Sequence, residues 1–87
     1  MIFQRFKSFV SDYKRLPKDI QKRVDEAILL CEQNPQHPSL HIKKMKATKN
    51  VWEGRVSRSY RFTFEWEGDV ITFRPVGTHD ILKEETR

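Results

Sequence analysis

The stretch from Trp52 to His79 constrains the fold most, because it holds three runs of alternating apolar and polar residues separated by short turn-forming segments. In the middle run, aromatic residues alternate with polar ones that include Arg61. Successive side chains of a β-strand point to opposite faces, so the aromatic residues predict a core face and Arg61 a polar face. The segments 57–59 and 67–69 suit tight hairpin turns. The stretch therefore predicts an antiparallel meander with strands at 51–56, 60–66 and 70–76.

The residues before this stretch have helical periodicity. Apolar residues recur at helical spacing from Phe6 to Leu16, where the helix should end because Pro17 disfavours helical geometry in the residue before it. Proline suits the first turn of a helix, so a second helix should start at Pro17. The two prolines of the segment 34–39 should end it. The apolar residues of this second helix share one face: Ile20, Val24, Ala27, Ile28 and Cys31.

Two further strands complete the expected architecture. Residues 40–45 predict a strand, and residues 2–4 are compatible with a short extra strand at the N-terminus. The fold class is α+β, with two N-terminal helices packed on one face of a curved, mainly antiparallel four-stranded sheet and the other face open. A chain of 87 residues suits one domain, residues 1–87.

Composition limits the partners and the compartment. Seventeen Lys and Arg against twelve Asp and Glu give a net charge of +5, which indicates a polyanionic or acidic partner. Cys31 is the single cysteine, so no internal disulfide forms and a reducing cytoplasm is expected. The apolar runs are too short for a membrane span, and the N-terminus lacks the apolar core of a signal peptide. Because Pro38 breaks helical spacing between His37 and His41, and no paired cysteines occur, we expect neither metal nor cofactor.

Several cations and a histidine allow two interpretations each. The guanidinium of Arg61 suits a phosphate, or an ion pair with Glu53 or Glu65 across the sheet. His79 follows a strand and a glycine, where an imidazole can transfer protons or simply make one hydrogen bond. Six more cations would either follow a phosphate backbone or form an ordinary solvated surface: Arg55, Arg58, Arg74, Lys43, Lys44 and Lys46.

The order of two helices, NPQHPSLHIKKMK, VWEGRVSRSYRFTFE and ITFRPVGTHDIL resembles the RelE/ParE superfamily of toxins from type II toxin-antitoxin systems over nearly the whole chain. The match is strongest to members that end in a Gly-Thr-His-Asp motif, here residues 77–80. The resemblance implies a metal-free mRNA endonuclease that acts on the ribosome. It implies that Arg61 binds the scissile phosphate, that His79 is the general acid and that His37 is the general base, with a cognate antitoxin as protein partner.

Two departures from the family pattern leave other functions open. Leu82 stands where many ribonuclease members have a tyrosine, and Gly54 falls where some relatives carry a lysine. Relatives with the same fold poison DNA gyrase, so a non-nuclease gyrase inhibitor is one alternative. An inactive binding protein with the toxin fold is another.

Overall fold

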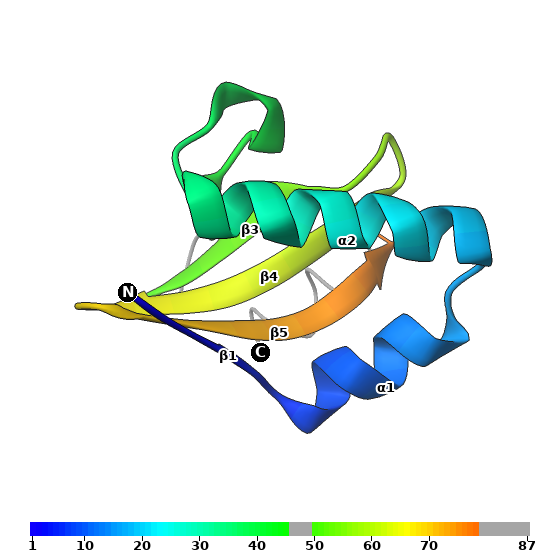
Figure 1. Cartoon of the computed structure of the whole chain (residues 1–87), viewed down its shortest axis with the longest axis horizontal. Helices are drawn as coiled ribbons and strands as arrows, with labels where there is room; N and C mark the ends of the chain where they lie inside the picture. Colours follow the sequence, from blue (N-terminus) through cyan, green and yellow to red (C-terminus); the bar gives the residue numbers. More distant parts are fainter. Residues whose placement is uncertain (46–49, 79–87) are drawn as a thin grey trace.

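The computed structural model describes residues 1–45 and 50–78, and within these ranges five strands form one sheet (Figure 1). The strand order is β1-β5-β4-β3-β2; β1 runs parallel to β5, and every other neighbouring pair is antiparallel. The elements in chain order are β1 (Ile2–Arg5), α1 (Lys7–Arg15), α2 (Lys18–Gln33), the 3-10 helix η1 (Pro38–Leu40), β2 (Lys43–Lys44), β3 (Val51–Arg55), β4 (Tyr60–Glu67) and β5 (Val70–Thr78).

The predicted α+β class and the β-meander are confirmed, and the short N-terminal strand forms as β1. The predicted strand at 40–45 is wrong for its first half. Pro38 begins a 3-10 turn, and His41 then adopts a left-handed backbone with φ 48°. Neither conformation continues a β-strand, so only Lys43 and Lys44 pair with β3.

The chain turns sharply between α1 and α2 at Leu16 and Pro17. Leu16 and Pro17 are extended, and α2 begins directly after Pro17 with Asp19 in its first turn, where a carboxylate favours the positive end of the helix dipole. The Tyr13 hydroxyl donates to Asp25 at 2.8 Å, and the Gln21 amide donates to the Tyr13 carbonyl oxygen at 2.9 Å. These bonds join the end of α1 to the first half of α2. Neither helix is of a length and apolarity that would let it cross a membrane, within the ranges that the structure describes.

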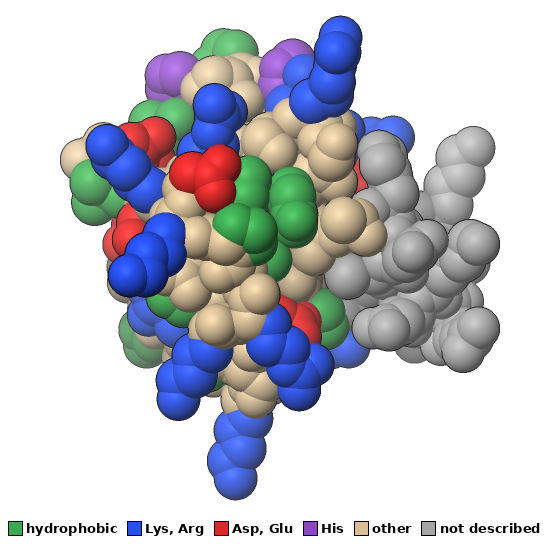
Figure 2. All heavy atoms as spheres, turned by 90° about the vertical axis from the view of Figure 1, so that its right-hand side faces the viewer, with side chains coloured by type: hydrophobic (Ala, Val, Ile, Leu, Met, Phe, Trp, Pro, Cys, Tyr) green, Lys and Arg blue, Asp and Glu red, His purple; other side chains and the backbone are tan. Residues whose placement is uncertain are grey.

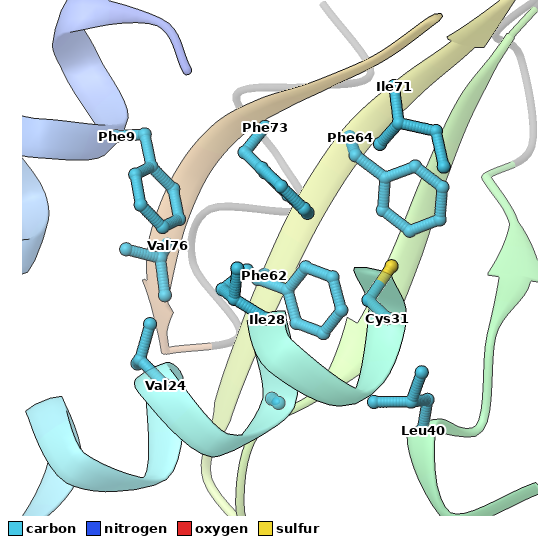
Figure 3. Close-up of a cluster of buried hydrophobic side chains, with 11 residues drawn as sticks. Phe9, Val24, Ile28, Cys31, Leu40, Phe62, Phe64, Ile71, Phe73 and Val76 are labelled. Carbon is cyan, nitrogen blue, oxygen red and sulfur yellow. The ribbon is translucent and has the colours of Figure 1, made fainter. Parts of the chain in front are cut away.

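The core lies between the helices and one face of the sheet (Figure 3). Phe62 and Phe64 of β4 and Phe73 of β5 are fully buried, with ring centroids 5.8–6.3 Å apart. Tilted and edge-on arrangements at this spacing are favourable for aromatic rings. The helices cover these rings with a set of buried apolar side chains: Phe9 from α1 and Val24, Ala27, Ile28 and Cys31 from α2.

A β-bulge shapes the last half of β5. Phe62 pairs with Val76 and Phe64 with Phe73, so two steps along β4 correspond to three along β5. The extra residue lies at Arg74 and Pro75, and proline suits this place because it has no N–H to donate to the ladder. Consequently Phe73 and Val76, three residues apart, both reach the core.

The second face of the sheet differs from the open surface that the alternation predicts. Glu53, Thr63 and Thr72 face away from the helices, yet all three are buried. Val51, on the same face, is also buried. The centre of this face is therefore covered, and its exposed cations lie toward the strand ends.

Candidate functional site

Arg55 and Arg61 lie directly opposite each other at the end of the β3–β4 hairpin that is next to its turn, here called the hairpin end. Residues that face each other across an antiparallel pair project from the same side of the sheet, so the two guanidinium groups emerge together. The turn that joins the strands is closed by hydrogen bonds to Tyr60, whose N–H donates to the Ser57 hydroxyl at 3.3 Å. Arg58 is exposed in this turn.

The guanidinium of Arg61 is oriented by backbone oxygens. Its Nη1 donates to the carbonyls of Ser57 at 2.6 Å, Tyr60 at 3.0 Å and Arg58 at 3.2 Å. Within residues 1–45 and 50–78, its Nε and Nη2 donate to no other residue. The side chain is thus held at one end while two donor atoms remain for an anion, the fork geometry that suits phosphate oxygens.

The two glutamates that could have neutralised Arg61 have other partners. Lys43 pairs with Glu53 at 3.2 Å, and Arg74 pairs with Glu65 at 2.5 Å. Lys43 and Arg74 therefore contribute less free positive charge than the sequence indicates. Lys44 is exposed and pairs in register with Trp52, on the helix side of the sheet. The cations that remain grouped around Arg61 are those of the hairpin end.

The structure does not bring His37 and Arg61 together. His37 caps η1, where its Nδ1 accepts from the Ser39 N–H at 3.2 Å and lies 2.8 Å from the Ser39 hydroxyl. His37 lines a cavity of about 330 Å³ that is also lined by Trp66. Trp66 lies five residues from Arg61 on β4 and on the opposite face, which corresponds to about 16 Å along the strand.

His79 and Lys46 lie outside the described residues. The strand that precedes His79 is described to its end, where Gly77 pairs with Arg61 and Thr78 pairs with Tyr60. Asp12 of α1 accepts a hydrogen bond from the Val76 N–H at 3.3 Å and so ties this strand end to the first helix. The last described residues of β5 therefore lie beside the hairpin end that carries Arg61.

A cleft of about 570 Å³ opens between α2 and the end of β3, and no sequence motif indicates it. Helical periodicity places Lys22 and Arg23 away from the apolar face, which indicates only solvent exposure. The cleft is bounded at one side by η1, which contacts both α2 and β3. The charged residues that line it are Asp19, Lys22, Arg23, Glu26 and Arg55, and Ala27, Leu30, Leu40 and Val56 are its apolar residues.

Two other kinds of chemistry find little support. No group of three or more His, Cys, Asp or Glu side chains could hold a metal ion within the ranges that the structure describes. The Cys31 thiol is buried, and this burial, with a smaller effect of Glu32, raises its pKa to about 12. A thiol with this pKa stays protonated at neutral pH, so it is a poor nucleophile.

Comparison with known proteins adds the family. Toxin RelE3 of Methanocaldococcus jannaschii is 39% identical over 72 residues, which cover 80% of this chain and 81% of that protein. The toxin fold of the RelB-RelE antitoxin-toxin complex from Methanococcus jannaschii matches with a TM-score of 0.75 and 31% identity, over 97% of this chain and 96% of that one. YafQ from E. coli strain BL21(DE3) matches with a TM-score of 0.78 and 15% identity, over 92% and 94% of the two chains, which shows the shared fold. No family model matches.

An identity of 39% over four fifths of both chains goes beyond a shared architecture, and it agrees with the order of helices and strands and with the solved toxin at 31% identity. The chain belongs to the RelE family of toxins from type II toxin-antitoxin systems.

Proposed function

We propose that this toxin is a metal-free endoribonuclease that cleaves mRNA on the ribosome. The observation that carries the proposal is the hairpin end, where an oriented Arg61 guanidinium lies opposite Arg55 and beside the end of β5. His79 follows Thr78 directly in the sequence. A phosphate-binding arginine and a titratable imidazole are the two groups that RNA cleavage without a metal needs first.

The reaction can be written for these groups. The ribose 2′-oxygen gives its proton to a water molecule and forms a bond to phosphorus, while the bond from phosphorus to the 5′-oxygen breaks. Arg61, assisted by Arg55, stabilises the negative charge that develops on the phosphate oxygens. His79 in its protonated form gives its proton to the departing 5′-oxygen. The products are a 2′,3′-cyclic phosphate and a 5′-hydroxyl.

The proposed partner is an antitoxin that covers part of this surface in the cytoplasm. The solved RelB-RelE complex supports this, because its toxin is 31% identical to this chain. The net charge of +5 suits a partner with acidic segments. The chain also exposes a set of large apolar side chains that a partner could cover: Met1, Ile2, Phe6, Val10 and Leu29.

The test is primer extension on cellular mRNA after brief induction of the toxin. Wild type should give cuts in phase with codons, and His79→Ala should reduce them at least about 10²-fold, because the leaving oxygen then has no proton donor. His41→Ala is the matched control, since this exposed histidine lies in the left-handed turn after η1. Undiminished cutting by the His79 variant would contradict the assigned role.

A different outcome of toxin induction would favour one of the alternative functions. Growth arrest with intact mRNA and blocked DNA supercoiling would indicate a gyrase inhibitor instead of a nuclease.

The variant His37→Ala tests the general base that the family resemblance implies. Because His37 lines a cavity with Trp66, which lies on the opposite face of the sheet from Arg61, we expect near wild-type cutting from this variant.

A further inference from the structure

We propose that the cleft between α2 and the end of β3 binds the backbone of single-stranded RNA and extends the Arg61 site. The choice of RNA as the ligand rests on the proposed function. The binding surface itself rests on the cleft, its charges and its connection to the hairpin end.

Arg55 belongs to both sites because it is the last residue of β3. Its Cα is paired with that of Arg61, and the residue also lines the cleft together with Lys22 and Arg23. Figure 2 views the end of the molecule where α2 begins and where the β3–β4 turn lies, and it shows more Lys and Arg side chains there than Asp and Glu. An RNA strand bound at Arg61 can therefore continue along the protein surface past Arg55 to Lys22 and Arg23.

The cations of the cleft are available for an anion. The ion pairs within residues 1–45 and 50–78 join Lys43 to Glu53 and Arg74 to Glu65. None of them includes Lys22, Arg23 or Arg55, although these three residues line one cavity. Phosphate groups attract such cations and release the counterions that screen the RNA, which favours binding at low salt.

The two acids in the cleft favour RNA over an acidic peptide. Asp19 and Glu26 repel any polyanion, and the carboxylate side chains of an acidic peptide have no donor that could compensate for this repulsion. RNA alternates phosphates with 2′-hydroxyl groups, and a 2′-hydroxyl can donate to a carboxylate or to the Ser39 hydroxyl, which also lines the cleft. The cations of the cleft therefore suit the phosphates of RNA, and its acceptor groups suit the 2′-hydroxyl groups that lie between them.

The size and the floor of the cleft also fit a nucleotide. A volume of about 570 Å³ falls within the usual range for small-ligand sites, about 300–1,000 Å³. Leu30 and Val56, which are half-buried, supply apolar surface on which a ribose or a base can rest. No base-reading hydrogen bonds are required, so the cleft should bind RNA with little sequence preference.

The experiment measures the salt dependence of binding to a fluorescent octauridylate by anisotropy. All proteins carry His79→Ala so that the RNA stays intact, and a denaturing gel checks this after each titration. The test variant is Lys22→Gln with Arg23→Gln, and the control is Lys7→Gln with Lys14→Gln. Both remove two positive charges from the net +5, but the control charges are exposed on α1 and do not line the cleft.

The test variant should bind the octauridylate about tenfold more weakly. The slope of log K against log salt should become shallower by about 1.4, because each lost phosphate contact to a single strand contributes about 0.7. The control should leave this slope unchanged. Glu26→Gln should tighten binding, because it removes repulsion and keeps an acceptor, and a gain of affinity cannot result from misfolding.

Equal affinities and slopes for the test and control variants would overturn the proposal, since net charge alone would then explain binding. An octaglutamate peptide that binds as tightly as the RNA, with the same dependence on Lys22 and Arg23, would overturn the assignment to RNA. The proposed nuclease activity is tested separately. If primer extension gives no cuts, but the slope of log K against log salt changes as described, RNA binding in the cleft is supported and only the proposed catalytic activity is contradicted.

Discussion

At the scale of single residues, Arg61 shows how local geometry decides between two interpretations of one side chain. The strand pattern allows an ion pair with a neighbouring glutamate or a bond to a phosphate. In the fold, Glu53 pairs with Lys43 and Glu65 with Arg74, and Arg61 donates to carbonyl oxygens of its own turn. Carbonyls orient a guanidinium without cancelling its charge. The arginine therefore remains positive at a place where the hairpin end meets β5.

Cys31 is a second case at this scale, and it makes stability depend on pH. Its folded pKa of about 12 lies above that of an exposed thiol, near 8.5. The thiol therefore contributes its full stabilisation below about pH 8.5 and loses it as the pH rises toward 12. Urea unfolding between pH 8 and 11 should show a steeper loss for wild type than for Cys31→Ala, approaching about 1.4 kcal/mol per pH unit in the upper part of this range.

Parallel pH curves for wild type and the Cys31→Ala variant would mean that the thiolate forms without penalty in the fold. The variant also controls for lysine and tyrosine titration, because both proteins share those groups. Its lower stability at pH 8 reflects only the loss of packing around a fully buried side chain.

At the scale of elements, the register of β3 explains the departure at Gly54. Gly54 pairs with Phe62 and faces the core, and an added Cβ would lie 2.4 Å from two carbons of the Phe62 ring and 2.8 Å from the Ile42 Cδ1. A lysine at this position would point at a fully buried ring. Arg55, one residue later, is the residue that shares a face with Arg61. The element itself thus decides which position can carry the cation.

This register predicts a packing defect for Gly54→Ala. The methyl group overlaps a ring that has no free space, so we expect a loss of about 1–3 kcal/mol in the free energy of unfolding, measured in urea. The double variant with Phe62→Leu should lose less than the sum of the two single changes. Gly68→Asn is the control, because its φ of +54° suits asparagine and nothing lies within 4 Å of an added Cβ.

Additive losses of stability for Gly54→Ala and Phe62→Leu in this double-mutant cycle would contradict the overlap between residue 54 and Phe62. A control variant that loses as much as Gly54→Ala would instead show that any added side chain in these strands and turns is costly. Either result would remove the explanation given for the absence of a lysine at this position.

At the scale of the whole molecule, β1, the first strand of the described chain, pairs with β5, the last one. It runs parallel to β5 with Ile2 opposite Val70, so it closes the sheet on the side away from β2. Phe3 stacks on Phe73 with ring centroids 6.3 Å apart and thereby extends the aromatic core to the sheet edge. Long-range pairing of this kind supports β5, the strand that leads to His79.

Phe3→Ala should therefore destabilise the fold by about 2 kcal/mol, since it removes a partly buried ring from the core. Ile2→Ala is the matched control, because Ile2 is 56% exposed and should cost less than about 1 kcal/mol. Urea unfolding measures both changes. Equal effects would mean that β1 contributes through its backbone pairing and not through the stacked ring.

The sequence by itself determined the elements that depend on local chemistry. Alternation along the strands, the turns at 57–59 and 67–69, and Pro17 between the helices each act over a few residues, so the meander and both helices could be predicted. The RelE resemblance was also visible in the order of these motifs. The alternation along the middle strand also placed Arg61 on the polar face of the sheet.

Only the tertiary structure decided the features that join distant parts of the chain. The parallel partner of β1, the bulge at Arg74, the separation of His37 from Arg61 and the cleft between α2 and β3 depend on contacts that no local pattern encodes. Periodicity states which face of an element is polar, but it does not state what lies opposite that face. Lys22 and Arg23 become part of a binding surface because β3 ends beside them, and this is a property of the packed molecule.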